Sequence, residues 1–228
     1  MILIKNMPCR RIIKFAVPFL IIPAIAVICV SVFEGKRYMI LSLCTAFFAL
    51  LLFAAGYEKK NVGTKRMVAA SVMTALCFAG RFIPVFKPVT AIIIITAMYM
   101  GSEAGFFVGA MTALISNFYF GQGPWTPFQM LGWGIIGFTA GALPKLLKKN
   151  RPLLLIFGAV SGILYSLVMD IWNVLWYSGG FNVKLYFAAI FTAIPHTTVY
   201  ALSNVIFLLL LAKPFGEKLE RIKIKGGL

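Results

Sequence analysis

Apolar residues dominate long stretches of the chain, and short polar breaks separate these stretches. Several apolar runs reach about 18 residues or more, the length that an α-helix needs to cross the hydrocarbon core of a membrane. The pattern therefore predicts an all-α integral membrane protein with eight transmembrane helices, the fourth of them short. We expect these helices at 15–33, 38–56, 66–83, 88–100, 103–120, 126–144, 153–177 and 185–211.

The first two expected helices differ from the other six in polarity. Their apolar runs contain no Asp, His, Asn, Gln or Trp, and the basic break YEKKNVGTKR follows them. This contrast predicts a two-helix membrane hairpin at 1–60 and a six-helix functional unit at 61–228, with one continuous eight-helix bundle as the alternative. The first run also resembles a signal peptide. No small-x-small cleavage site ends it at Val32-Phe33-Glu34, so we expect it to be retained.

The charge distribution predicts the orientation of the chain. The 228 residues are 61% hydrophobic and carry a net charge of +16, but the basic residues lie in the breaks and not on one solvated face. Nucleic-acid binding is therefore not indicated. If the N-terminus is cytoplasmic, 17 of the 22 basic residues lie inside, and the positive-inside rule then predicts both termini in the cytoplasm. The turn at 120–126 would lie outside.

Polar residues at membrane depth form the first part of a candidate site. A charge in the hydrocarbon core costs about 2.5 to 3.5 kcal/mol on insertion scales, so Asp170 has to face protein, water or a ligand. Asp170, Asn173 and Tyr177 are spaced by three and four residues and share one side of their helix, with Trp172 on the adjacent stripe. Tryptophan near a membrane end also serves as an interfacial anchor.

The segment SNFYFGQGPWTPFQMLGWG supplies the second part. Asn117 and Tyr119 end one expected helix, Gln122 and Trp125 belong to the outer turn, and the next helix begins after it. On that helix Gln129 and Trp133 are four residues apart and share a face. Together with the Asp170 stripe, these residues predict an outward-facing cup with aromatic walls, which suits a flat, partly polar organic molecule.

The last expected helix carries His196 near mid-membrane, directly after Pro195. Pro195 leaves a backbone carbonyl without its helical partner close to this histidine, so His196 is a further candidate for ligand contact. A hydrogen-bonded packing role is the alternative.

Small residues at fourfold spacing form ridges that let membrane helices pack closely. Most of these ridges contain glycine, and we expect them to serve internal packing. The ridge of Ser71, Ala75 and Ala79 lacks glycine over Ala75-x-x-x-Ala79, and it is the candidate for contact with a second protein.

No catalytic, metal or cofactor motif is present in the sequence. It has no P-loop, no His-Glu-x-x-His and no Gly-x-Ser-x-Gly, and its four cysteines show no metal-binding spacing. We therefore expect no enzyme activity and no cofactor, and if solute is moved uphill we expect another subunit to supply the energy. A self-sufficient secondary carrier or channel and an intramembrane enzyme are the alternatives.

Four features together resemble one family. They are the Ala75-x-x-x-Ala79 ridge and the segments GQGPWTPFQMLGWGIIGFTAG, LYSLVMDIWNVLWYSGG and IPHTTVYALSNVIFLLLL. Residues 61 to 215 are similar to the substrate-binding S component of energy-coupling factor (ECF) transporters, the bacterial importers of vitamins and related micronutrients. The GQGPWTPFQ run is the most specific of the four.

The resemblance implies a six-helix S-component fold in the bacterial cytoplasmic membrane. Its partners would be a transmembrane T component and two ATPase subunits, with Ala75 and Ala79 docking on the T component. Substrate would bind at the loop from Arg81 to Lys87, at the turn from Gln122 to Trp125 and at the outer parts of the last three helices. A cobalamin-like compound is the favoured substrate, with a flavin or a modified base as alternatives. The N-terminal hairpin departs from the six-helix pattern.

Overall fold

The computed structural model of the protein describes residues 16–21, 24, 44–49, 63–123, 125–178 and 181–226. Within this part the chain is all helical, and no strand occurs in it. A short π-helical turn, η1, precedes the α-helices. The elements are η1 (Val17–Ile21), α4 (Gly63–Gly80), α5 (Val89–Met100), α6 (Ser102–Phe120), α7 (Thr126–Ala142), α8 (Pro144–Lys149), α9 (Arg151–Ser178) and α10 (Val183–Gly226).

Six of these helices match the six expected after residue 60, with boundaries shifted by a few residues. The largest difference is at the C-terminus, where α10 continues to Gly226 and not to residue 211. Loss of apolar character ends a membrane run but does not end a helix, because the backbone hydrogen bonds continue through an amphipathic segment. The expected helices at 15–33 and 38–56 lie mostly outside the described residues, so the hairpin at 1–60 stays a prediction.

Two helices of the described part are long and apolar enough to cross a membrane. They are Arg151–Ser178, which is α9, and the Val183–Ile222 portion of α10. Helix α5 is more apolar than either but shorter, because only 12 residues separate Pro88 from Gly101.

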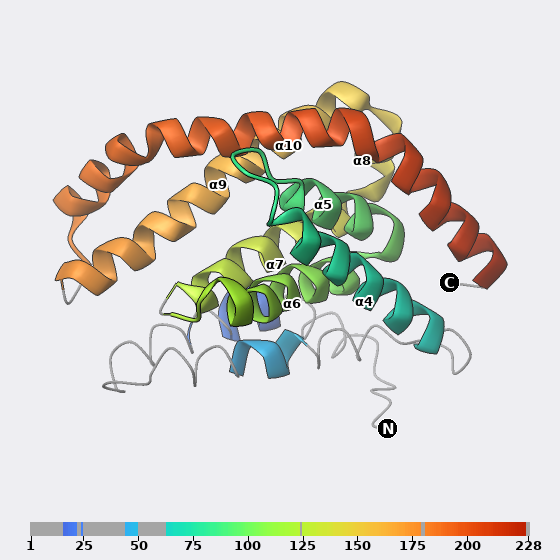
Figure 1. Cartoon of the computed structure of the whole chain (residues 1–228), viewed down its shortest axis with the longest axis horizontal. Helices are drawn as coiled ribbons and strands as arrows, with labels where there is room; N and C mark the ends of the chain where they lie inside the picture. The colour runs from blue at the N-terminus through green and yellow to red at the C-terminus, as the bar shows by residue number, and fades with distance from the viewer. Residues whose placement is uncertain are drawn as a thin grey trace.

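Helix α5 lies at the centre of the described structure. All of its residues from Val89 to Met98 are buried, as expected for a helix that is apolar on every side. Figure 1 shows α10 arching over α5, while α6 and α7 lie on its other side. This arrangement brings the N-terminal end of α5 next to α7, α9 and α10, where the candidate site is found.

Glycines set the close approach of α6 and α7. A Cβ atom added to Gly105 would lie 2.4 Å from the Gly137 carbonyl oxygen, and one added to Gly109 would lie 2.4 Å from the carbonyl oxygen of Trp133. Backbone atoms cannot move aside as a side-chain end can, so only glycine fits at these crossings. The glycine ridge therefore serves internal packing, and it fixes Trp133 and its neighbours relative to α6.

Candidate functional site

A buried hydrogen-bond network connects three segments of the chain at Arg81, the residue that follows α4. The Arg81 Nη1 donates to the Ser116 hydroxyl and, at 2.6 Å, to the Asn117 Oδ1. The Asn117 Nδ2 in turn donates to Thr126 Oγ1 and Gln129 Oε1, both at 2.8 Å. Because Asn117 is fully buried, these bonds hold it in a single orientation between Arg81 and α7.

Aromatic rings also lie close to the Arg81 guanidinium. The Arg81 guanidinium carbon lies 4.7 Å from the ring centroid of Phe120 and 5.6 Å from that of Trp133. Trp133 is stacked on Tyr165, with 5.0 Å between centroids and 11° between planes. Tyr165 meets Tyr200 edge-on at 5.4 Å. A cation over these ring faces is attracted by their quadrupoles, so the rings help to fix Arg81.

A small cavity of about 50 Å³ lies between the segment after α4, α7, α9 and α10. This volume is far below the roughly 300 to 1,000 Å³ of ordinary small-molecule sites, so the cavity admits a small chemical group and not a whole vitamin in this conformation. The lining residues are Arg81, Lys87, Val89, Thr90, Gln129, Trp133, Gly162, Tyr165, Tyr200 and Asn204.

The cavity has a positive electrostatic character. Two of its lining residues are basic, and no acidic residue of the described part lines it. Burial lowers the pKa of the Arg81 guanidinium, and burial together with the nearby Arg81 charge lowers the pKa of the Lys87 ammonium. Each shift reflects a charge that lacks full solvation. A ligand that presents oxygen acceptors or a negative charge would relieve both costs.

Three of the predicted site residues line this cavity, namely Arg81, Gln129 and Trp133. A fourth, Asn117, lies directly behind them and orients both Arg81 and Gln129 through its hydrogen bonds. These four residues come from the segment after α4, from α6 and from α7. Packing brings them together over sequence separations of 12 to 36 residues.

The other predicted residues do not line the cavity. The Gln122 Nε2 donates to the Leu114 carbonyl at 2.9 Å and so closes the outer turn. Trp125 contacts Trp172, with 5.8 Å between the ring centroids. Tyr119 packs against Phe82 and is largely exposed. Asn173 is half-buried, and Tyr177 and His196 are exposed.

Asp170 lies on the face of α9 that packs on α10. It continues a stripe of buried residues at fourfold spacing, Gly158, Gly162, Ser166, Asp170 and Val174. Ser166 in this stripe bonds the Thr197 hydroxyl of α10 at 2.6 Å. The Asp170 Oδ2 is buried and has no hydrogen-bond partner among the residues that the structure describes. Asp170 is therefore a residue of the α9–α10 seam and does not line the cavity.

Sequence reasoning did not single out Tyr165 and Tyr200 as site residues. A signal was present on α10, since Tyr200 and Asn204 are four residues apart and share a helix face that ends in polar groups. On α9, Gly162 and Tyr165 are likewise neighbours at a spacing of three. Helix packing turns these two faces toward Arg81. No local sequence pattern indicates that direction.

The predicted docking ridge on α4 is exposed along its length. Ser71, Ala75 and Ala79 all face outward, whereas Met73 and Cys77 on the opposite side of α4 are buried in the core. Exposed apolar side chains flank the ridge, Val68 and Val72 among them. In the described part, this side of α4 is an exposed surface of small and apolar side chains that a second helix can approach closely.

Among the described residues, no three His, Cys, Asp or Glu side chains gather to form a metal site. The cavity at Arg81 offers hydrogen-bond donors, aromatic ring faces and basic side chains. These groups are suited to binding a small molecule.

Residues 61–221 match the model of one family, described as the S component of ECF-type riboflavin transporters. The chain is also 27% identical over 150 residues to a UPF0397 protein of Aliivibrio salmonicida, a match covering 62% of this chain and 79% of that protein. A UPF0397 protein of Vibrio atlanticus is 30% identical over 100 residues, covering 40% of this chain and 54% of the relative. No solved structure matches the chain significantly.

Proposed function

Because the chain belongs to the family of S components of ECF-type riboflavin transporters, we propose that it is the substrate-specific membrane subunit of an ATP-driven importer. It captures a vitamin or related micronutrient from outside the cell. The observation that carries this proposal is the extent of the family match, because residues 61–221 include every residue of the cavity and the whole α4 ridge. The membrane location and the transport role follow from the same family membership.

The cavity at Arg81 is the proposed point of capture. Arg81 and Lys87 supply donors for oxygen atoms of the substrate, and Gln129 adds an amide beside them. The stacked rings of Trp133 and Tyr165 form a wall for a flat ring system. Entry of a whole vitamin requires the cavity to widen, and the segment 81–88 forms its rim without helical hydrogen bonding along most of its length.

The substrate class is tested with named compounds. Riboflavin is the first of them because the matching family is that of riboflavin transporters. A cobalamin-like compound, which the family resemblance of the sequence favours, and a modified base are tested beside it. Mass spectrometry of small molecules that co-purify with the protein is the most direct identification.

The partners of the chain in this proposal are a T component and two ATPase subunits. The exposed ridge of Ser71, Ala75 and Ala79 is the proposed docking surface for the T component, because its side chains are small and it lies on a different element from the cavity lining. Substrate binding and partner docking are thus separable by mutation.

Reconstitution in liposomes tests the function. We expect uptake only when the T component, both ATPases and ATP are present, because the sequence contains no nucleotide-binding motif of its own. The control is the same preparation with the chain omitted. Uptake by the chain alone, driven by an ion gradient, would instead establish the self-sufficient carrier and overturn the proposal.

A further inference from the structure

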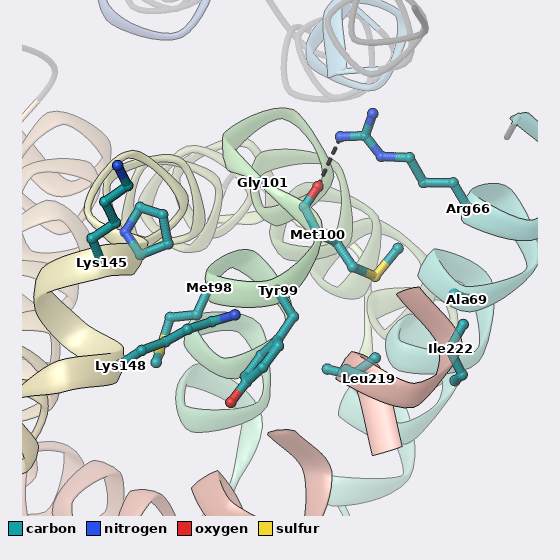
Figure 2. A pocket seen from close by; sticks show the side chains of 11 residues that line it. Arg66, Ala69, Met98, Tyr99, Met100, Gly101, Lys145, Lys148, Leu219 and Ile222 are labelled. Carbon is teal, nitrogen blue, oxygen red and sulfur yellow. Dashed lines mark hydrogen bonds between the residues drawn. The ribbon is translucent and has the colours of Figure 1, made fainter. Parts of the chain in front are cut away.

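A second and larger cavity lies at the opposite end of α5 from the Arg81 site. It has a volume of about 440 Å³ and is formed by the start of α4, the turn between α5 and α6, helix α8 and the C-terminal part of α10. Figure 2 shows Lys148 of α8 on one side of this cavity and Leu219 and Ile222 of α10 on the other, with Tyr99 between them. The basic residues that line it are Arg66, Lys145 and Lys148.

An apolar cleft of about 350 Å³ adjoins this cavity between α4 and α10. The two spaces share Ala69, Leu219 and Ile222, so they meet along one wall. Val68, Val72 and Met73 form most of the rest of the cleft, and among the described residues that line it Lys65 is the only charged one. Each volume falls in the roughly 300 to 1,000 Å³ range of ordinary ligand sites.

The basic side of the cavity has charge to offer a ligand. No acidic residue lines it among the described residues. Lys148 lies 3.6 Å from the Tyr99 ring centroid and 3.1 Å from Glu220 Oε2, but this ion pair is exposed and such pairs contribute little. Lys145 makes no ion pair with any residue of the described part. Both lysines can therefore turn to an anion at small cost.

The cavity is also at the side of the molecule where anionic lipid is expected. The positive-inside distribution predicts that the starts of α4 and α8 and the end of α10 face the cytoplasm. Basic pockets between helices at this membrane face bind anionic head groups. In this predicted orientation, the apolar cleft beside the cavity would face the lipid chains of the inner leaflet.

We propose that the basic cavity and the apolar cleft together bind one anionic phospholipid of the inner leaflet. The lipid phosphate lies near Lys145 and Lys148, and an acyl chain lies in the cleft along Val68, Val72 and Ile222. The proposal rests on the position of the basic cavity directly beside the apolar cleft. A soluble anion needs no apolar cleft, and an uncharged lipid needs no lysine cluster. The site is independent of substrate capture at Arg81.

Native mass spectrometry of the full-length chain, released from detergent, tests the site. The chain is titrated with phosphatidylglycerol and with phosphatidylcholine that carries identical acyl chains. We expect one phosphatidylglycerol to bind more tightly than phosphatidylcholine. The double variant Lys145→Ala/Lys148→Ala should weaken phosphatidylglycerol binding about tenfold to thirtyfold, since each lysine near an anionic head group contributes to affinity. Lys149→Ala, an exposed neighbour on α8 that does not line the cavity, is the matched control and should have no effect.

A second variant tests the cleft separately. Val68→Trp fills the cleft from an exposed position, so it should weaken binding of the complete lipid without altering thermal unfolding. Equal retention of both lipids, or equal loss in Lys149→Ala and the double variant, would overturn the proposal. If glycerol 3-phosphate or inorganic phosphate binds as tightly as phosphatidylglycerol, the site serves a soluble anion. If Val68→Trp releases a partner protein and leaves lipid binding unchanged, the cleft is a protein docking surface, and the lipid proposal fails.

Discussion

At the scale of single residues, Arg81 and Trp133 decide the chemistry of the candidate site. Hydrogen bonds and aromatic rings hold Arg81 in place, and Arg81 also lines the cavity. Trp133 is almost fully buried, and its ring is fixed against Tyr165. A side chain that is already held in one conformation loses little conformational entropy when a ligand binds. It therefore contributes more to affinity than a mobile side chain does.

Replacing Trp133 with alanine should weaken substrate binding by on the order of 1 kcal/mol or more, because aromatic contact area is lost. The measurement is a titration of the purified chain with riboflavin and cobalamin, for whichever of them binds. Trp176→Ala is the matched control, since Trp176 is exposed and does not line the cavity. An unchanged dissociation constant for Trp133→Ala would remove this residue from the site.

At the scale of helices, α4 has two faces with different tasks. Met73 and Cys77 pack into the core, while Ser71, Ala75 and Ala79 leave a smooth ridge on the outside. Helices in lipid associate largely by close packing, so an exposed ridge of small residues favours contact with another helix. The ridge does not line the Arg81 cavity. In this region of the chain, the residues that line it belong to the segment that follows α4.

Ala75→Trp should therefore abolish uptake by the reconstituted importer and leave substrate binding intact, because the indole blocks helix contact far from the cavity. Uptake and co-purification of the T component are measured side by side with the dissociation constant. Ala188→Trp places the same bulk on an exposed position of α10 and should change none of these quantities. Complex formation that is unaltered in Ala75→Trp would contradict the docking role.

At the scale of the whole molecule, α5 separates two cavities that are both lined by basic residues. The smaller one lies at the N-terminal end of α5 with Val89 and Thr90, and the larger one lies at its C-terminal end with Met98 to Gly101. Helix α10 connects the two, because Tyr200 and Asn204 belong to the first and Leu219 and Ile222 to the second. Figure 1 shows α10 extending over the whole described structure. The predicted topology assigns the two cavities to opposite membrane faces.

Labelling with a membrane-impermeant maleimide in whole cells tests this topology. A cysteine introduced by Gln122→Cys or Lys184→Cys should react from outside, because both positions belong to segments that the positive-inside rule assigns to the outer face. Lys149→Cys should react only after the cells are opened. The unmodified chain, with its four native cysteines, sets the background. Reaction of Lys149→Cys in intact cells would invert the predicted orientation.

The sequence by itself determined where the helices after residue 60 lie, and it marked the residues at the turn after α6. Helix location follows from the length and period of apolar runs, and these runs are local features of the sequence. The same holds for the turn at Gly121, where a backbone φ of 105° needs glycine. Local pattern also marked Arg81, Gln129 and Trp133 as polar or aromatic groups at the outer ends of helices.

Only the tertiary structure decided which of these groups meet. The bonds from Arg81 to Asn117 and from Asn117 to Gln129 depend on how α6 and α7 are rotated at their glycine crossings. Asp170 has as strong a sequence signal as any of them, yet the rotation of α9 turns it into the seam with α10 and brings Tyr165 to the cavity instead. A helix face is fixed by sequence spacing, but its direction in space is fixed by packing against other helices, so local pattern cannot supply it.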